Sequence, residues 1–360
     1  MVQKDLKPTD GLFGFITDIQ SAGDSYMTNH YKNIGKVAEW LPMTHIIDGG
    51  DFIMGNEEKE KTVELLRNYS RLVHKNNIPY LVAKGNHDDN GFYATTHGTL
   101  PEDLITDEEW YALVTKYNER YKNVVVDKDN PAGGYCYIDA EVSKIRTIVV
   151  NVCDVPYKDS DGNPYKDDTG KAKYNAMQNY AIREQQLKFV REALKCADKS
   201  DCHEWGIIVC MHFPDAVTIN NNCLFSMLAS KCGLPGYSEN KNYTYKYEHD
   251  DFGVGVSEDD PFEYNFYDYR GDVIAVISGH KHYDTSGKIW NNFTSIIVDS
   301  SYPDGNDNRD SRPIGTVDED CFDIVRVDRE EKKVYCYRFG GLGNLTERRR
   351  SYDYTTTVGE

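Results

Sequence analysis

The stretch at residues 80–88 reads Tyr-Leu-Val-Ala-Lys-Gly-Asn-His-Asp, an apolar run that ends in a glycine and three polar side chains. Its first four residues are aromatic or aliphatic, as in a strand that is buried on both faces. Gly85 permits a tight turn directly after the strand. The stretch therefore predicts a buried strand whose carboxyl end presents Asn86, His87 and Asp88.

Four further apolar runs end in the same way, each passing directly into polar residues. They are residues 14–17 before Asp18, residues 45–47 before Asp48-Gly-Gly-Asp51, residues 207–210 before Met211-His212, and residues 273–277 before Ser278-Gly-His280-Lys-His282. In open α/β sheets the ligand crevice lies beyond the carboxyl ends of the strands. We therefore expect these motifs, which are spread over most of the chain, to converge at one site.

Polar stretches with helical periodicity alternate with these strands, which is typical of an α/β protein. Residues 57–74 and 181–197 carry apolar side chains at helical spacing. Thr106 and Glu109 have the spacing of a capping box, which predicts a third helix that runs to about Arg120.

The chain shows no repeat and no Pro- or Ser-rich linker, so we expect one domain over residues 1–360. Three long polar stretches are expected to be inserted loops or lids that select the substrate, near residues 89–107, 157–179 and 218–263. Two alternating apolar segments around a charged turn predict a β-hairpin at residues 322–339 that closes the domain.

The side chains at the predicted strand ends are donors that suit a pair of metal ions. They are Asp18, Asp51, Asn86, His212, His280 and His282. Two ions about 3.5–4 Å apart can clamp a phosphoryl group and supply a nucleophile near neutral pH. This set offers carboxylates that can bridge two ions and imidazoles that bind as neutral nitrogen ligands, so the sequence predicts a dimetal centre.

The order of the motifs resembles the calcineurin-like metallophosphoesterase superfamily, the group of the purple acid phosphatases and the acid sphingomyelinase-like phosphodiesterases. Its pattern is Asp-x-His, Gly-Asp, Gly-Asn-His-(Asp/Glu), a separate His, and Gly-His-x-His, and four of these five blocks match in order over residues 13–283. The resemblance implies a four-layer α-β-β-α sandwich of two mixed sheets, with a dimetal site at the carboxyl ends of the strands.

The resemblance also implies a role for each matching residue. Asp18 and His282 would hold the first ion, Asp51 would bridge both ions, and Asn86, His212 and His280 would hold the second ion. His87 would be the catalytic imidazole, which donates a proton to the leaving oxygen or a hydrogen bond to the phosphoryl group. Asp88 beside it would orient the His87 ring.

One position departs from the pattern, because Gln20 stands where the superfamily has histidine. An amide oxygen is a harder and weaker ligand than imidazole, so a site that contains it favours Mn²⁺ or Fe over Zn²⁺. We expect Gln20 to be a ligand of the first ion or to lie beside it. Loss of the first ion is the alternative.

The activity that the resemblance implies is hydrolysis of a phosphate monoester or diester of a small organic or nucleotide-like substrate, by attack of a metal-bound hydroxide. The formal net charge of −18 opposes binding of long nucleic acids through a basic face. The rival interpretation, motivated by Gln20, is a catalytically weak metal-binding scaffold or a regulatory protein.

The longest apolar runs fall far short of the roughly 20 residues that a membrane-spanning helix needs, so no membrane span is expected. The amino-terminal residues have no signal-peptide core, which favours a cytoplasmic protein and leaves secretion open if a signal peptide has been removed. Nine cysteines without a CxxC pair do not indicate a zinc knuckle. Either all thiols are free, or Cys196/Cys202 and Cys223/Cys232 form disulfides.

Overall fold

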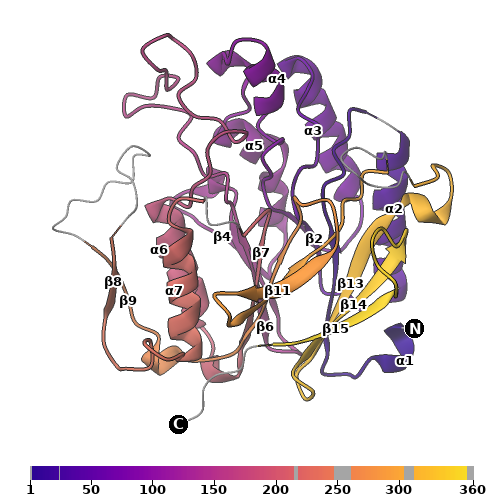
Figure 1. Ribbon diagram of the computed structural model, residues 1–360, viewed down its shortest axis with the longest axis vertical. Coiled ribbons are helices and arrows are strands. Elements are labelled where there is room, and N and C mark those ends of the chain that lie inside the picture. Colours follow the sequence, from indigo (N-terminus) through magenta and orange to yellow (C-terminus); the bar gives the residue numbers. More distant parts are fainter. Residues whose placement is uncertain (1, 24, 215–217, 247–260, 304–311, 355–360) are drawn as a thin grey trace.

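The computed structural model of the protein describes residues 2–23, 25–214, 218–246, 261–303 and 312–354, and two large mixed sheets dominate it (Figure 1). The first sheet has the order β15 (Arg349–Asp353), β14 (Lys333–Gly340), β13 (Cys321–Asp328), β1 (Gly11–Ile16), β2 (Ile46–Asp48) and β3 (Tyr80–Val82). The second has the order β11 (Thr285–Ile289), β12 (Phe293–Ile297), β10 (Val273–Ser278), β7 (Gly206–Met211), β6 (Ile145–Val150), β5 (Cys136–Ala140) and β4 (Val124–Val126). A small sheet pairs β8 (Tyr243–Tyr245) with β9 (Phe262–Tyr264).

The helices flank the two sheets on opposite sides (Figure 1). The described α-helices are α1 (Val2–Asp5), α2 (Ser25–Trp40), α3 (Lys59–Val73), α4 (Gly91–Thr96), α5 (Asp107–Leu113), α6 (Glu184–Lys195) and α7 (Asn221–Cys232). In the view of Figure 1, α6 and α7 lie on the left of the strands and α2 lies on the right.

Three apolar cores separate the layers, and the alternation of side chains along β1 shows why. Leu12 and Ile16 point to the core that the first sheet shares with α2 and α3. Phe13 and Phe15 point the other way, into the core between the two sheets. A third core joins the second sheet to α6 and α7. Because successive side chains of a strand face opposite sides, each central strand supplies two cores. The predicted four-layer α-β-β-α sandwich is confirmed.

The parallel strands that precede the predicted site lie side by side within each sheet. In the first sheet β1, β2 and β3 are parallel neighbours. In the second sheet β7 and β10 are parallel neighbours. All five strands therefore end at the same edge of the sandwich.

Two predicted helices match α3 and α6, and the third is shorter than expected. The capping box of Thr106 and Glu109 begins α5 as predicted. The α-helix ends at Leu113 because Val114 leaves helical geometry with φ −122° and ψ −64°, and a 3₁₀ helix covers Thr115–Arg120.

The expectation of loops or lids at residues 218–263 is wrong for α7, which is a buried helix of the third core. A helix that is buried all round lacks the polar face that makes a helical period visible in a sequence. Residues 247–260 of this stretch lie outside the described residues.

All nine cysteines are free thiols, and no helix among the described residues is long and apolar enough to cross a membrane.

Candidate metal centre

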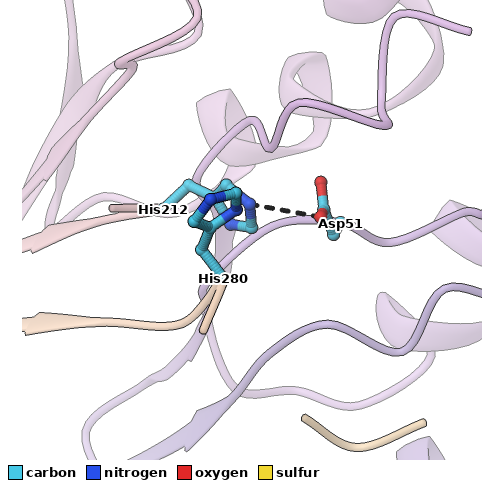
Figure 2. Close-up of side chains that lie close together, drawn as sticks. All are labelled: Asp51, His212 and His280. Atoms are coloured by element: carbon cyan, nitrogen blue, oxygen red, sulfur yellow. Dashed lines mark ion pairs between the residues drawn. The ribbon is translucent and has the colours of Figure 1, made fainter. Parts of the chain in front are cut away.

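The five strand ends meet at a cluster of carboxylates and imidazoles. Two groups of donors have ligand atoms that all lie within 4.8 Å of one another: Asp51 with His212 and His280, and Asp18 with Asp51 and His282. Figure 2 shows both imidazoles of the first group beside the Asp51 carboxylate. Asp51 belongs to both groups, which is the placement that a carboxylate between two ions requires.

Short distances link the donors within each group. His212 Nε2 lies 3.2 Å from Asp51 Oδ2, and His282 Nε2 lies 3.0 Å from Asp18 Oδ1. Asn86 joins the first group, because its Oδ1 lies 3.0 Å from His212 Nε2 while its amide nitrogen faces Met177 Sδ at 3.3 Å. The structure therefore brings together the six donors that follow the predicted strands.

The backbone at these donors is held in an unusual conformation. Asp18, Gln20, Asp51, His280 and His282 all have positive φ, between 46° and 69°. A left-handed conformation costs a residue other than glycine roughly 1–2 kcal/mol, and such strain clusters at functional sites. This unfavourable conformation occurs at five positions that lie close together in space. It therefore supports a functional role for the geometry of these residues.

Two glycines leave the space that the carboxylates occupy. A Cβ on Gly85 would lie 2.2 Å from Asp51 Oδ1, and a Cβ on Gly279 would lie 2.2 Å from Asp18 Oδ2. Both distances are too short for any side chain. At both positions glycine therefore lets the backbone approach the neighbouring carboxylate closely.

His87 lies beside the cluster with its ring fixed by the backbone. Its Nδ1 lies 2.7 Å from the carbonyl oxygen of Met54, and since a carbonyl only accepts, Nδ1 carries the proton of that bond. The other nitrogen, Nε2, lies 3.9 Å from Asp51 Oδ2. The ring thus directs its second nitrogen toward the metal donors.

The expectation that Asp88 orients the His87 ring is wrong. The buried Asp88 carboxylate accepts hydrogen bonds from four backbone N–H groups, those of Gly85, Asp51, Phe52 and Ile53, at 2.7 to 3.4 Å. It joins the loop after β2 to the loop after β3. Asp88 therefore holds the backbone of Asp51 in place, and the carbonyl group of Met54 orients the His87 ring.

Gln20 is buried beside the bridging carboxylate. Its side chain is 5% exposed, and its amide nitrogen lies 3.4 Å from Asp51 Oδ2. Its backbone N–H donates to the carbonyl oxygen of Asp51 at 2.9 Å. The residue that departs from the superfamily pattern therefore reaches the site.

Three groups that contact the site residues could not be recognised from the sequence. Thr17 Oγ1 donates to Asp18 Oδ2 at 2.6 Å, but Thr17 reads as an ordinary strand residue. The Met54 carbonyl is a backbone group, which every residue has. Met177 approaches Asn86 from residues 157–179, and only the folded chain brings them together.

The carboxylates and imidazoles of the cluster shift one another's pKa values toward their charged forms. Burial alone would lower the pKa of His212, but the carboxylates of Asp51 and Asp18 outweigh it and raise this pKa to about 10. Burial alone would raise the pKa of Asp51, but His212 and His87 outweigh it and hold this pKa below its ordinary range. When no ion is bound, His212 is therefore protonated at neutral pH.

This charge state predicts that metal binding releases a proton. Since an ion can bind His212 only after the imidazole loses its proton, affinity for the second ion should rise about tenfold per pH unit between pH 6 and 8. Titration calorimetry with Mn²⁺ in two buffers of different ionisation enthalpy would count the protons released. If metal binding released no proton at pH 7, His212 would not be protonated in the metal-free protein, contrary to this prediction.

A second prediction concerns Gln20. If its amide oxygen faces the first ion, Gln20→His should tighten binding of Zn²⁺ relative to Mn²⁺ at that site, because imidazole suits Zn²⁺ better than an amide oxygen does. The change should be about tenfold, in line with the effect of residues around a metal site. Metal titrations of the two proteins at one pH would measure it, with Gln3→His as the control at an exposed position. Identical titrations with both metals would mean that Gln20 only hydrogen-bonds Asp51.

No protein-family profile and no curated protein matches the chain. Among solved structures the chain is similar to a dimetal phosphatase from Danio rerio, at 12% identity, over 97% of this chain and 100% of that one, with a TM-score of 0.58. It also matches a purple acid phosphatase from yellow lupin seeds, at 10% identity over 97% and 55% of the two chains, with a TM-score of 0.46. The chain therefore has the same fold as this dimetal phosphatase, which agrees with the resemblance of its motifs to the calcineurin-like metallophosphoesterases.

Proposed function

We propose that the chain is a dimetal hydrolase that cleaves phosphate esters of small organic or nucleotide-like compounds. The observation that carries this proposal is the presence of Asp51 in both groups of potential ligands. The similar structure from Danio rerio is named a dimetal phosphatase, which agrees with the proposal. That likeness, at 12% identity, is one of fold, and we infer the activity from the side chains of the site.

The donor set fits two ions. Asp18, Asp51 and His282 would hold the first ion with Gln20 beside it, and Asp51, Asn86, His212 and His280 would hold the second. Two such ions polarise a phosphoryl group and supply a nucleophile near neutral pH. The two carboxylates at the first site, with the amide group of Gln20 beside them, favour Mn²⁺ or Fe over Zn²⁺.

His87 can supply a proton to the leaving group, which the metal ligands cannot do. With Nδ1 donating to the Met54 carbonyl, the ring is held in place and Nε2 faces the cluster. A proton on Nε2 can pass to the oxygen of the leaving group as its bond to phosphorus breaks. The His87 side chain is 15% exposed, so a substrate can approach one edge of its ring.

The first experiment is metal analysis of the purified protein after loading with Mn²⁺, Fe²⁺ or Zn²⁺, followed by a panel of mono- and diesters. We expect two ions per chain, together with turnover that chelation removes and one of these metals restores. The panel should include 4-nitrophenyl phosphate, bis(4-nitrophenyl) phosphate, nucleoside monophosphates and cyclic nucleotides. Full turnover after complete removal of metal would overturn the proposal.

The second candidate is a catalytically weak scaffold, and the observation that favours it is the amide of Gln20 at the position of an imidazole. A scaffold has no use for a proton donor aimed at the metal donors, so the geometry of His87 argues against it. One bound ion, or none, with no turnover of any ester in the panel would favour the scaffold.

A further inference from the structure

An exposed aromatic ring lies directly against the proposed proton donor. Phe92, at the start of α4, stacks on His87 with ring centroids 5.8 Å apart and an angle of 25° between the planes. Phe92 is nevertheless 40% exposed. The part of the ring that His87 does not cover is therefore open to a molecule that occupies the site.

A second apolar side chain, Met177, contacts the same motif at Asn86. Its Sδ lies 3.3 Å from the amide nitrogen of Asn86. Its Cγ would lie 3.1 Å from a Cβ placed on Gly91, so Met177 packs against the residue that precedes Phe92. We call Phe92 and Met177 the apolar rim. One member touches a proposed metal ligand, and the other touches the proposed acid.

The buried carboxylate of Asp89 holds both halves of the rim. Asp89 Oδ1 accepts from the backbone N–H of Gly91 at 2.7 Å, and Oδ2 accepts from that of Ala176 at 2.6 Å. Each of these residues directly precedes a rim residue. Since one fully buried carboxylate holds both backbones, the rim is preorganised and is not a chance contact of two loops.

The charge of Asp89 is itself balanced inside the protein. The hydroxyl group of Tyr157 donates to Asp89 Oδ2 at 3.0 Å, and Lys84 Nζ donates to the same hydroxyl oxygen at 3.0 Å. Lys84 also pairs with Asp107 at 3.2 Å. The network ties residues 157–179 to the loop that carries Asn86 and His87, so the rim is part of the site's framework.

From this arrangement we infer that the proposed hydrolase selects esters whose leaving group carries an aromatic ring, which the apolar rim binds. The inference rests on the proposed function and names its substrate class. In the reaction, the oxygen of water bonds to phosphorus, the bond from phosphorus to the ester oxygen breaks, and that oxygen takes a proton from His87 Nε2. His87 regains a proton from the water. The carbon on the leaving oxygen is then within a few ångströms of His87, and Phe92, which stacks on His87, presents its exposed part there.

The experiment compares benzyl phosphate with propyl phosphate, because both release an aliphatic alcohol and differ mainly in the ring. We expect kcat/KM of the metal-loaded wild type to be about tenfold higher for the benzyl ester, since stacking and burial of one ring contribute this much. Phe92→Ala should remove most of that preference, so kcat/KM for benzyl phosphate should fall severalfold further than kcat/KM for propyl phosphate. Met177→Ala should reduce the preference less.

A matched control is Trp290→Ala. Trp290 is 39% exposed, lies at the turn between β11 and β12, and packs on Phe225. Its loss should leave the preference unchanged. Asp89→Asn weakens the hold on both rim residues, so it should lower the preference while metal content stays at the wild-type level.

Binding of benzylphosphonate and propylphosphonate to the metal-loaded proteins separates this inference from the proposed function. These compounds are not hydrolysed and share the phosphonate group, so the difference between their affinities reports the rim. A benzyl preference that depends on Phe92 supports the inference even in a protein without turnover, which would count against the proposed function only. Equal binding of both compounds, or an equal loss of both in Phe92→Ala, would overturn the inference.

Discussion

Asp51→Asn is expected to abolish nearly all phosphoesterase activity and to lower the content of both metal ions. The carboxylate of Asp51 lies in both ligand groups and faces His212 at 3.2 Å. An amide offers one weak oxygen donor and no charge, so neither ion keeps its bridging ligand. Since metal ions contribute several kcal/mol to such reactions, the loss in kcat/KM should be on the order of a thousandfold or more.

The substitution keeps the shape of the side chain, so folding is not expected to confound this test. The backbone N–H of Asp51 still has the Asp88 carboxylate as its acceptor, and an amide oxygen can still accept from the backbone N–H of His87. Metal content by mass spectrometry and kcat/KM with 4-nitrophenyl phosphate are the readouts. Asp161→Asn, on an exposed turn, is the control. Full metal content together with the full rate in Asp51→Asn would refute the dimetal proposal.

His87→Ala is expected to depress turnover about 10²–10⁴-fold while both ions stay bound, because general acid catalysis contributes this much and His87 is not a proposed ligand. The loss should depend on the leaving group. Propanol has a basic oxygen that needs a proton, whereas 4-nitrophenolate leaves without one. The ratio of wild-type to variant kcat should therefore be much larger for propyl phosphate than for 4-nitrophenyl phosphate.

The control for this variant is His97→Ala, an exposed histidine that stacks on Tyr93 near the end of α4. It should behave as the wild type with both esters. A loss of metal in His87→Ala would show that His87 is a ligand. A loss of equal size with both esters would show that it acts on the phosphoryl group and does not protonate the leaving oxygen.

The polar motifs at the ends of buried strands were predictable from the sequence for a local reason, whereas the four-layer sandwich was expected from the resemblance to a known superfamily. A strand buried on both faces must be apolar, and where it ends the first polar side chains stand out, as at Asp18, Asn86 and His212. Residues of parallel neighbours that follow their strands must meet at one edge of the sheets. The helix α7 was missed because it is buried on every side, so its sequence lacks the polar face that marks a helical period.

What the sequence by itself determined is the identity of the donors and the sheet edge to which they belong, because a strand and the turn that follows it are contiguous in the chain. Which partner each side chain takes was decided by tertiary structure alone. Asp88 follows His87 in the chain, yet its carboxylate binds four backbone N–H groups, and the carbonyl of Met54, far away in sequence, holds the His87 ring. Met177 likewise meets Asn86 across 91 positions of the chain. A buried polar group forms hydrogen bonds with whichever partner the folded chain brings within reach. That partner often belongs to a segment far away in the sequence, so the sequence around the group does not reveal it.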